Sequence, residues 1–246
     1  MRAGAGRVRG RLGFGPVGPR RRRYTIGPGQ LESLTLPVGD DGVVIGVDED
    51  GFPAVLGLNR PSAYDIALVG GLWTAQVLAL RAAATGTRIV VETGRPDAWA
   101  SLERALGGGR LALHEVGRVP PPGASAASPV VVVRDCGMRP PRGRAVPGPW
   151  RSVVTLLPYL GPAAPGLLGK ASLVGVQRVS PEEAEEVGHL MRLPADAVGA
   201  LPALEDGATL WCTRRECRLV TTRPTDAESG LLGAARRLDR EARRPD

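Results

Sequence analysis

Short runs of consecutive apolar residues alternate with amphipathic stretches from residue 43 onward, and this alternation predicts an α/β fold. The runs are short and bounded by Gly, Pro or Asp, which is typical of strands buried in a parallel sheet. The stretches between them carry apolar positions at helical spacing. Strands are expected at 43–47, 54–58, 66–69, 88–92, 111–113, 130–133, 152–157, 172–176, 208–212 and 217–221.

Helices are expected between these strands at 72–84, 96–106 and 180–192, and after the last strand at 225–243. The third has the clearest start, because Ser180 stands at the cap, Pro181 follows it, and Glu183 comes three residues on. The other acidic residues of its first turns are interpreted as favourable charges at the positive end of the helix dipole, not as a catalytic pair.

The order of these elements predicts one mainly parallel α/β sheet with flanking helices, P-loop- or Rossmann-like, with antiparallel hairpins at the edges. The hairpins are 43–58 and 208–221, and the unit 66–92 is a βαβ crossover. We expect a single domain over 30–246, with flexible inserts near 117–128 and 137–149. Residues 1–29, rich in Arg, Gly and Pro, are predicted to be a disordered arm.

The positive charge of the chain is concentrated in this arm. The formal net charge is +7, yet residues 1–23 hold eight arginines and no acid, so the remaining chain is nearly neutral. A neutral folded part argues against a nucleic-acid-binding face on the domain. The arm, densest at Arg20, Arg21, Arg22 and Arg23, is expected either to attach to anionic lipid or nucleic acid, or to stay solvated without a partner. Near lipid, each charge contributes about 1 kcal/mol.

No segment of the sequence is apolar for long enough to cross a bilayer. The longest apolar stretch, 66–80, has 15 residues, and about 20 are needed. With no signal peptide and an odd number of cysteines, the expected location is cytoplasmic. If the arm binds lipid, the protein is expected to attach peripherally at the inner face of the cell membrane. Cys212 and Cys217 either face each other across the second hairpin, as a bridge or redox switch, or are two buried thiols. Two histidines far apart in sequence leave too few ligands for zinc, so no metal is expected.

The turn after the strand 66–69 is where an α/β sheet of this type binds phosphate. A P-loop there has the pattern G-x-x-x-x-G-K-[ST], in which glycines let N–H groups wrap the phosphates, lysine neutralises charge and the hydroxyl holds magnesium. This chain has Gly70-Gly71, but Ala75 replaces the second glycine, Gln76 the lysine and Val77 the hydroxyl residue. Trp73 is expected to crowd the phosphate space, and the sole lysine, Lys170, is about a hundred residues away.

A P-loop ATPase also needs acidic residues after a second strand, and here only one of them is present. The strand 130–133 leads to Asp135, and Cys136 stands where a second acid would hold magnesium and water. Asp135 alone is interpreted as a turn-capping carboxylate. A pairing of Cys136 with either histidine has no supporting motif. We therefore expect no catalytic residues, no cofactor and no nucleotide hydrolysis.

Residues 43–77 resemble the segment that leads to the P-loop in FtsK-like and EccC-like translocation ATPases, because Gly46, Asp48, Gly51 and Pro53 match the hairpin pattern G-x-D-x-x-G-x-P. Over residues 40–225 the chain also resembles the soluble domain of EccE-type proteins of actinobacterial type VII secretion. The matching short motifs are Val69-Gly70-Gly71, Ala75-Gln76, Arg88-Ile89-Val90-Val91 and Arg95-Pro96-Asp97-Ala98-Trp99.

The resemblance implies a non-catalytic accessory or scaffold subunit, a pseudo-ATPase that contacts other secretion subunits, among them an FtsK/EccC-type ATPase. The contact is expected on the exposed face of the helix 72–84 or on one of the hairpins. EccE-type proteins usually carry N-terminal transmembrane helices, where this chain has the arginine-rich arm. The alternative is an α/β enzyme that binds a nucleotide or small molecule at Gly70-Gly71, with Glu92 as the ribose-binding acid.

Overall fold

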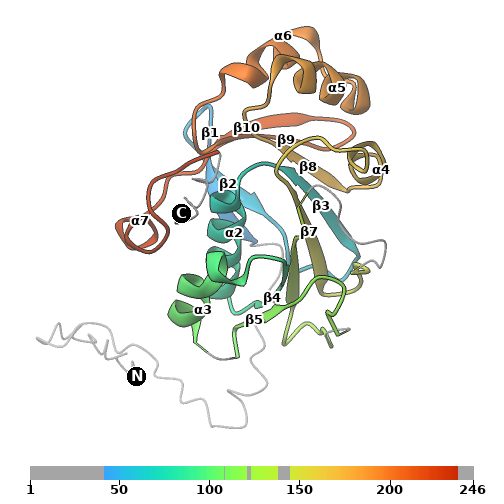
Figure 1. The fold of residues 1–246 in the computed structure, drawn as a ribbon. Helices are drawn as coiled ribbons and strands as arrows, with labels where there is room; N and C mark the ends of the chain where they lie inside the picture. Colours follow the sequence, from blue (N-terminus) through green and yellow to red (C-terminus); the bar gives the residue numbers. More distant parts are fainter. Residues whose placement is uncertain (1–41, 108, 121–122, 138–144, 238–246) are drawn as a thin grey trace, which may run out of the picture. The chain divides into compact units, whose positions relative to one another are not determined.

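The computed structural model describes residues 42–107, 109–120, 123–137 and 145–237, and these build a single mixed sheet (Figure 1). The expected arm at 1–29 and parts of both expected inserts lie outside the described residues. The strands are β1 (Val43–Asp48), β2 (Pro53–Leu56), β3 (Tyr64–Val69), β4 (Arg88–Thr93), β5 (Leu111–His114), β6 (Val130–Asp135), β7 (Arg151–Leu157), β8 (Leu173–Val176), β9 (Ala208–Cys212) and β10 (Cys217–Thr221).

Within these residues the ten strands are ordered β2-β1-β10-β9-β8-β3-β7-β6-β4-β5. The half from β8 to β5 is parallel, and β3 lies between β7 and β8. The predicted class, a mainly parallel α/β sheet with flanking helices, is confirmed.

Both predicted hairpins form, but they lie side by side at one edge of the sheet. β1 pairs with β10, so the β1–β2 hairpin extends the β9–β10 hairpin, and the opposite edge is the parallel strand β5. Local turn signals identify a hairpin but carry no information about which neighbour it joins. At the end of the second hairpin, Cys212 and Cys217 are paired in register and joined by a disulfide bond.

The helices and helical turns cover both faces of the sheet. They are α2 (Leu72–Ala84), η1 (Pro96–Trp99), α3 (Ala100–Leu106), α4 (Ala164–Leu168), α5 (Pro181–Met191), α6 (Ala195–Ala200), η2 (Leu201–Ala203) and α7 (Asp226–Leu232). The short elements α4 and α6 were not expected from the sequence, because five or six residues are too few to show a helical period.

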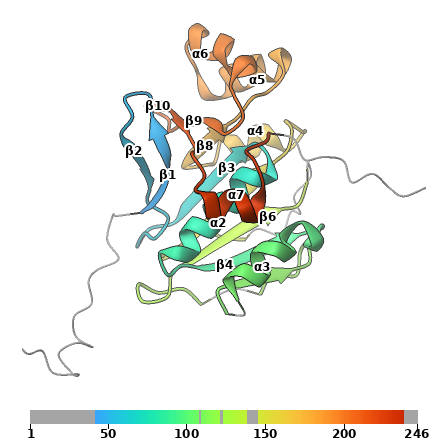
Figure 2. The same cartoon turned by 90° about the vertical axis from the view of Figure 1, so that its left-hand side faces the viewer.

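Two apolar cores lie on opposite sides of β3, because successive side chains of a strand point to opposite faces. Ile66 and Leu68 pack in a core with α2 and α3, whereas Ala67 and Val69 pack in another with α4 and α5. Figure 2 shows α2, α3 and α7 together in front of the strands. β3 is therefore buried on both faces, which explains its continuous apolar run.

Helix α2 offers no exposed face of the kind expected for partner binding. It packs against β1, β4, β6, α3 and α7, and all its residues are buried except Leu80, Arg81 and Ala84. Of the two surfaces expected to contact a partner protein, only the hairpins remain.

The last helix is shorter than predicted. Thr225 and Glu228 form a capping box at its start, but it ends at Leu232, and Gly233 follows with φ of 75°. A left-handed glycine commonly terminates a helix. The prediction of a helix over 225–243 is therefore wrong for 233–237, while 238–246 lie outside the described residues. In the part of the chain that is described, no helix is long and apolar enough to cross a membrane.

Candidate functional site

The carboxyl ends of β3, β7 and β8 meet at one edge of the sheet, and the chain crosses from one side of β3 to the other at this point. After β3 it continues through α2 to β4 on one side, and after β7 it passes to β8 on the other. Such a switch of direction is where open α/β sheets bind ligands. Gly70-Gly71 lie here, between β3 and α2.

The turn is too short to form the loop that the P-loop alignment implies. Helix α2 begins at Leu72, only two residues after β3, so the positions aligned with a phosphate loop are already helical. Ala75 and Val77, aligned with glycine and the magnesium-binding hydroxyl, are fully buried in the apolar core. Alignment by residue type could not detect that the helix starts early.

Gln177, directly after β8, fills the space beside the turn. Its Oε1 accepts a hydrogen bond from the Gly71 N–H at 2.7 Å, and its Nε2 donates to Thr74 Oγ1 at 2.6 Å. The side chain is only 2% exposed. A protein amide thus takes the backbone donor at the start of α2 that a phosphate oxygen would otherwise use.

Residues 233–237 run across the same edge. Trp73 Nε1 donates to the Gly233 carbonyl at 3.1 Å. At the other end, the buried guanidinium of Arg237 donates to the carbonyls of Pro158 at 2.7 Å and Arg178 at 2.8 Å, which follow β7 and β8. We call residues 233–237 the C-terminal strap, because they connect all three loops of the switch point.

Both glycines of the turn are required by this internal packing. A Cβ on Gly70 would lie 2.4 Å from Gln177 Oε1, and a Cβ on Gly71 would lie 2.3 Å from the Arg237 carbonyl oxygen. Real Cβ contacts are not this short. The sequence signal that suggested close approach of a phosphate therefore reflects close approach of the protein's own side chain and backbone.

Gly71→Ala is expected to displace the C-terminal strap and to lower the free energy of unfolding by about 1–3 kcal/mol, the usual cost of overpacking. Limited trypsin digestion should then cleave after Arg236 or Arg237 faster than in the wild type. Gly166→Ala is the matched control, because nothing lies within 4 Å of a Cβ built there and its helix tolerates alanine. Equal trypsin sensitivity of Gly71→Ala and wild type would contradict the contact.

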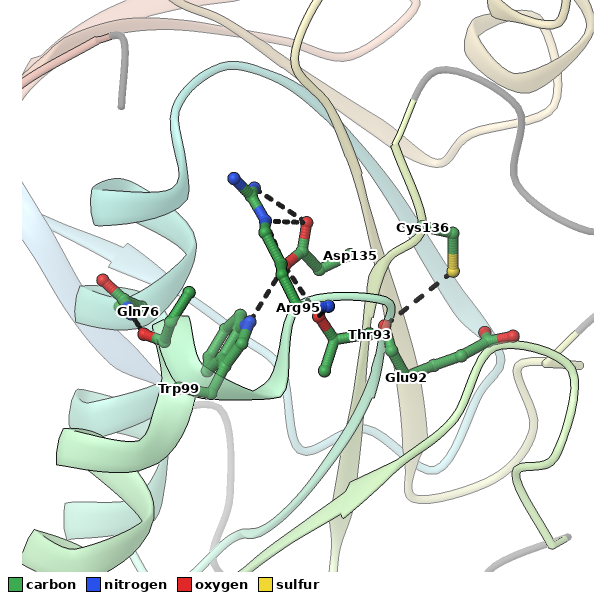
Figure 3. A network of polar contacts seen from close by, with 8 residues as sticks. Gln76, Glu92, Thr93, Arg95, Trp99, Asp135 and Cys136 are labelled. Atoms are coloured by element: carbon green, nitrogen blue, oxygen red, sulfur yellow. Dashed lines mark hydrogen bonds and ion pairs between the residues drawn. The ribbon is translucent and has the colours of Figure 1, made fainter. Parts of the chain in front are cut away.

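Trp73 does not fill the phosphate space, and Gln76, at the position of the P-loop lysine, does not face the turn. Trp73 is 1% exposed and packs in the core, so it anchors the C-terminal strap instead of standing over the turn. Gln76 Nε2 donates to the Ala98 carbonyl at 2.6 Å, which ties α2 to η1 (Figure 3).

Asp135 is engaged by three donors at the end of β6. Arg95 forms an ion pair with it, with Nη2 2.9 Å from Oδ1, while Trp99 Nε1 and Thr93 Oγ1 donate to Oδ2 at 2.9 and 3.1 Å (Figure 3). The carboxylate is 2% exposed. The turn-cap interpretation of Asp135 is wrong, because its partners are side chains from β4, from η1 and from Arg95, which precedes η1. A carboxylate held this way has little capacity left for magnesium or water.

Glu92, the ribose-binding candidate, accepts hydrogen bonds from within the protein on both carboxylate oxygens. Arg134 Nε lies 2.6 Å from its Oε2, and the Gly117 N–H donates to its Oε1 at 2.8 Å. Both side chains of the ion pair are less than 5% exposed. The structure places Glu92 in a buried charge pair that crosses from β4 to β6, not at an open ribose site.

The Cys136 thiol is unsuited to nucleophilic chemistry. Burial, followed by the nearby Glu92 carboxylate, raises its pKa to about 12. Its Sγ donates to the Glu92 carbonyl at 3.8 Å. A thiol with this pKa is protonated at neutral pH, and only the thiolate attacks.

Alkylation of Cys136 by iodoacetamide is expected to be slow and steeply pH-dependent. At pH 8 only about one thiol in ten thousand is ionised, against roughly one in four for an ordinary cysteine. The labelling rate, followed by mass spectrometry, should rise about tenfold per pH unit from pH 7 to 10 without a plateau. Guanidinium-unfolded protein serves as the control and should titrate normally. A plateau near pH 8.5 in the folded protein is incompatible with a raised pKa.

Sequence reasoning missed Gln177, Arg95 and Arg237. Gln177 and Arg95 each follow a strand of the parallel half, so a search of strand ends for polar residues would have found them. Arg237 belongs to no periodic pattern and is visible only in the tertiary structure. Within the described residues, no cluster of three or more His, Cys, Asp or Glu could hold a metal ion.

Neither the protein-family models nor the curated proteins include a match to this chain. Among solved structures, the chain is similar to VirB4 of Thermoanaerobacter pseudethanolicus, with 10% identity and a TM-score of 0.58, over 76% of this chain and 98% of that one. It also matches the genome packaging NTPase B204 of Sulfolobus turreted icosahedral virus 2 in complex with AMPPCP, with 8% identity and a TM-score of 0.48, over 67% and 100%. What this chain shares with VirB4 at this identity is the fold, a mainly parallel α/β sheet with flanking helices.

Proposed function

We propose that this protein is a non-catalytic accessory or scaffold subunit of a type VII secretion system, EccE-like, which acts through protein–protein contacts. The observation that carries the proposal is the filled switch point, where Gln177 and the C-terminal strap occupy the edge at which a P-loop fold binds nucleotide. The fold shared with VirB4 and the sequence resemblance to EccE-type proteins support the secretion context.

The β1–β2 hairpin is the surface that we propose for partner binding. Val44 and Val55 are paired across it, and both are about half exposed, while Phe52 at its turn is 67% exposed. Single exposed apolar side chains are normal on a protein surface, but three large ones on one hairpin indicate an interaction site. Pro53 on the edge strand β2 limits pairing with a further strand, so side chains would make the contact.

The partner proposed for this hairpin is an FtsK/EccC-type secretion ATPase. A scaffold with an NTPase-like sheet could present the same edges as the ATPase domains that it resembles. In this proposal, the arm with Arg20, Arg21, Arg22 and Arg23 adds attraction to an anionic membrane, and the protein acts as a peripheral subunit at its cytoplasmic face.

Co-purification with the ATPase from the same cell tests the contact. The double variant Phe52→Asp and Val55→Asp should reduce recovery of the ATPase at least tenfold at unchanged melting temperature. Val116→Asp, which changes an exposed apolar residue on another loop, is the matched control. Undiminished recovery with the double variant would exclude the hairpin, and no recovery with the wild type at low salt would exclude the partner.

Calorimetry with Mg·ATP and a phosphate-release assay test the absence of catalysis. We expect no heat that depends on the Gly70-Gly71 turn and no phosphate above buffer. Micromolar binding of Mg·ATP that Gly71→Ala abolishes, or measurable turnover, would instead establish the alternative, an enzyme that uses this turn.

A further inference from the structure

A basic cavity lies at the amino end of β8, whereas the Gly70-Gly71 turn lies at the carboxyl end of the neighbouring strand β3. Its volume is about 310 Å3, and it opens between the ends of α4 and α5 and the tip of the β9–β10 hairpin, next to the amino end of β8. A more open hollow adjoins it and shares four of its residues. The position is independent of the filled switch point, so another ligand could occupy it.

The lining combines an apolar floor with a cationic rim. Leu168, Leu190 and Met191 form the floor together with the disulfide-bonded Cys212. The cations are Arg192 and Arg214, joined in the adjoining hollow by Lys170 and Arg215, and neither set of lining residues contains an acid.

These four cations have no ion-pair partner among the described residues. Arg214 makes one hydrogen bond, from Nη2 to the Gly169 carbonyl at 3.2 Å. Two of the cations stand at helix ends: Arg192 is the C-cap of α5, and Lys170 follows α4. A helix C-terminus carries only about half a negative charge, so two helix ends leave a clear positive excess here.

The arginine-bearing loop is closed by a disulfide bond and by short-range hydrogen bonds. Cys212 and Cys217 close the loop Thr213–Glu216 by their disulfide, and Thr213 Oγ1 accepts hydrogen bonds from the N–H groups of Arg215 and Glu216, both at 3.2 Å. A backbone closed in this way limits the positions that the arginine side chains can reach, and this lowers the entropy lost when they bind an anion.

We propose that this cavity binds a small molecule that carries phosphoryl groups. Guanidinium groups match the geometry of phosphate oxygens, and the cations of the rim could share one multiply charged anion. The apolar floor would accept the body of the molecule, and the volume suits a small ligand. Lys170, the only lysine of the chain, acts here as a point charge.

Calorimetry on the full chain tests the proposal, with sodium pyrophosphate and with magnesium-free ADP at constant ionic strength. Pyrophosphate should bind with a Kd below about 1 mM. Tighter binding of ADP would indicate that the ligand includes an organic body on the apolar floor, whereas equal affinity would indicate a site for the phosphate chain alone.

The variants separate a built site from diffuse attraction. Arg192→Ala with Arg214→Ala should weaken binding at least tenfold, while Arg214→Lys keeps the charge and should lose less. Arg218→Ala removes an exposed arginine from the same hairpin, outside the cavity lining, and should change Kd less than twofold. Gly71→Ala should leave this binding intact.

Two results would overturn the proposal. One is no heat with either anion. The other is equal weakening by Arg218→Ala and the double variant, since that pattern indicates attraction by net charge. The arm is the same in all variants and contributes a constant background. Because the partner-binding test uses the β1–β2 hairpin, either proposal can fail without the other.

Discussion

Replacing Arg134 with methionine is expected to lower the free energy of unfolding by about 3–5 kcal/mol. The substitution leaves the Glu92 carboxylate buried without its counter-ion, and an uncompensated buried charge is strongly destabilising. The pair is short, at 2.6 Å, and both side chains are less than 5% exposed. Urea denaturation followed by tryptophan fluorescence or circular dichroism measures the change.

The double variant Arg134→Met with Glu92→Leu should be more stable than the sum of the single changes implies, by at least about 1.5 kcal/mol, because it removes both charges together. It should not recover fully, since the Gly117 N–H loses its acceptor. A loss below about 1 kcal/mol for Arg134→Met alone would mean that water reaches the pair in solution.

Glu228→Gln is expected to cost about 2–3 kcal/mol at pH 7, a loss that depends on pH. Arg81 binds Glu228 through two hydrogen bonds, Nε to Oε1 at 2.7 Å and Nη2 to Oε2 at 2.9 Å. The same guanidinium donates to the carbonyls of Val44 and Arg223, so it ties α2 to β1 and to the segment before α7. Neutral glutamine keeps the shape but loses the charge assistance.

The sign of the pH dependence follows from the lowered pKa of Glu228. The hydrogen bonds from Arg81 are the main cause, and they hold this pKa below 4.5 in the folded protein. The ionised carboxylate therefore stabilises the fold above its unfolded pKa, and this stability is lost as the pH falls through the lower folded value. The difference between wild type and Glu228→Gln should be constant near neutral pH and shrink below about pH 4.

Asp206→Asn is the matched control for this series. Asp206 pairs with Arg178 at the same 2.9 Å, but both side chains are more than 40% exposed. An exposed pair contributes about 0–1 kcal/mol. If Asp206→Asn and Glu228→Gln shifted stability equally, the Arg81–Glu228 contact would not have the structural role assigned to it.

The sequence by itself determined the elements whose signals are local. The apolar runs of β3 and β6 identify strands buried on both faces, and the capping box at Ser180 marks the start of α5, because cap and period depend on neighbours a few residues away. Turn residues between two apolar runs identified both hairpins, and a pair of glycines after an apolar run located the turn at Gly70-Gly71. It also predicted the α/β class, since strand and helix signals alternate along the chain.

Only the tertiary structure decided what occupies that turn and which charges meet. Gln177 and Arg237 reach it from segments more than a hundred residues away in sequence, and the partners Glu92 and Arg134 lie 42 residues apart. Such contacts follow from strand order and from where a helix starts and ends, and no short-range pattern encodes either. The replacement of lysine by Gln76 could be seen in the sequence, but the filling of the site by the protein's own C-terminal strap required the packed sheet, because it depends on three loops that meet only after the strands have paired.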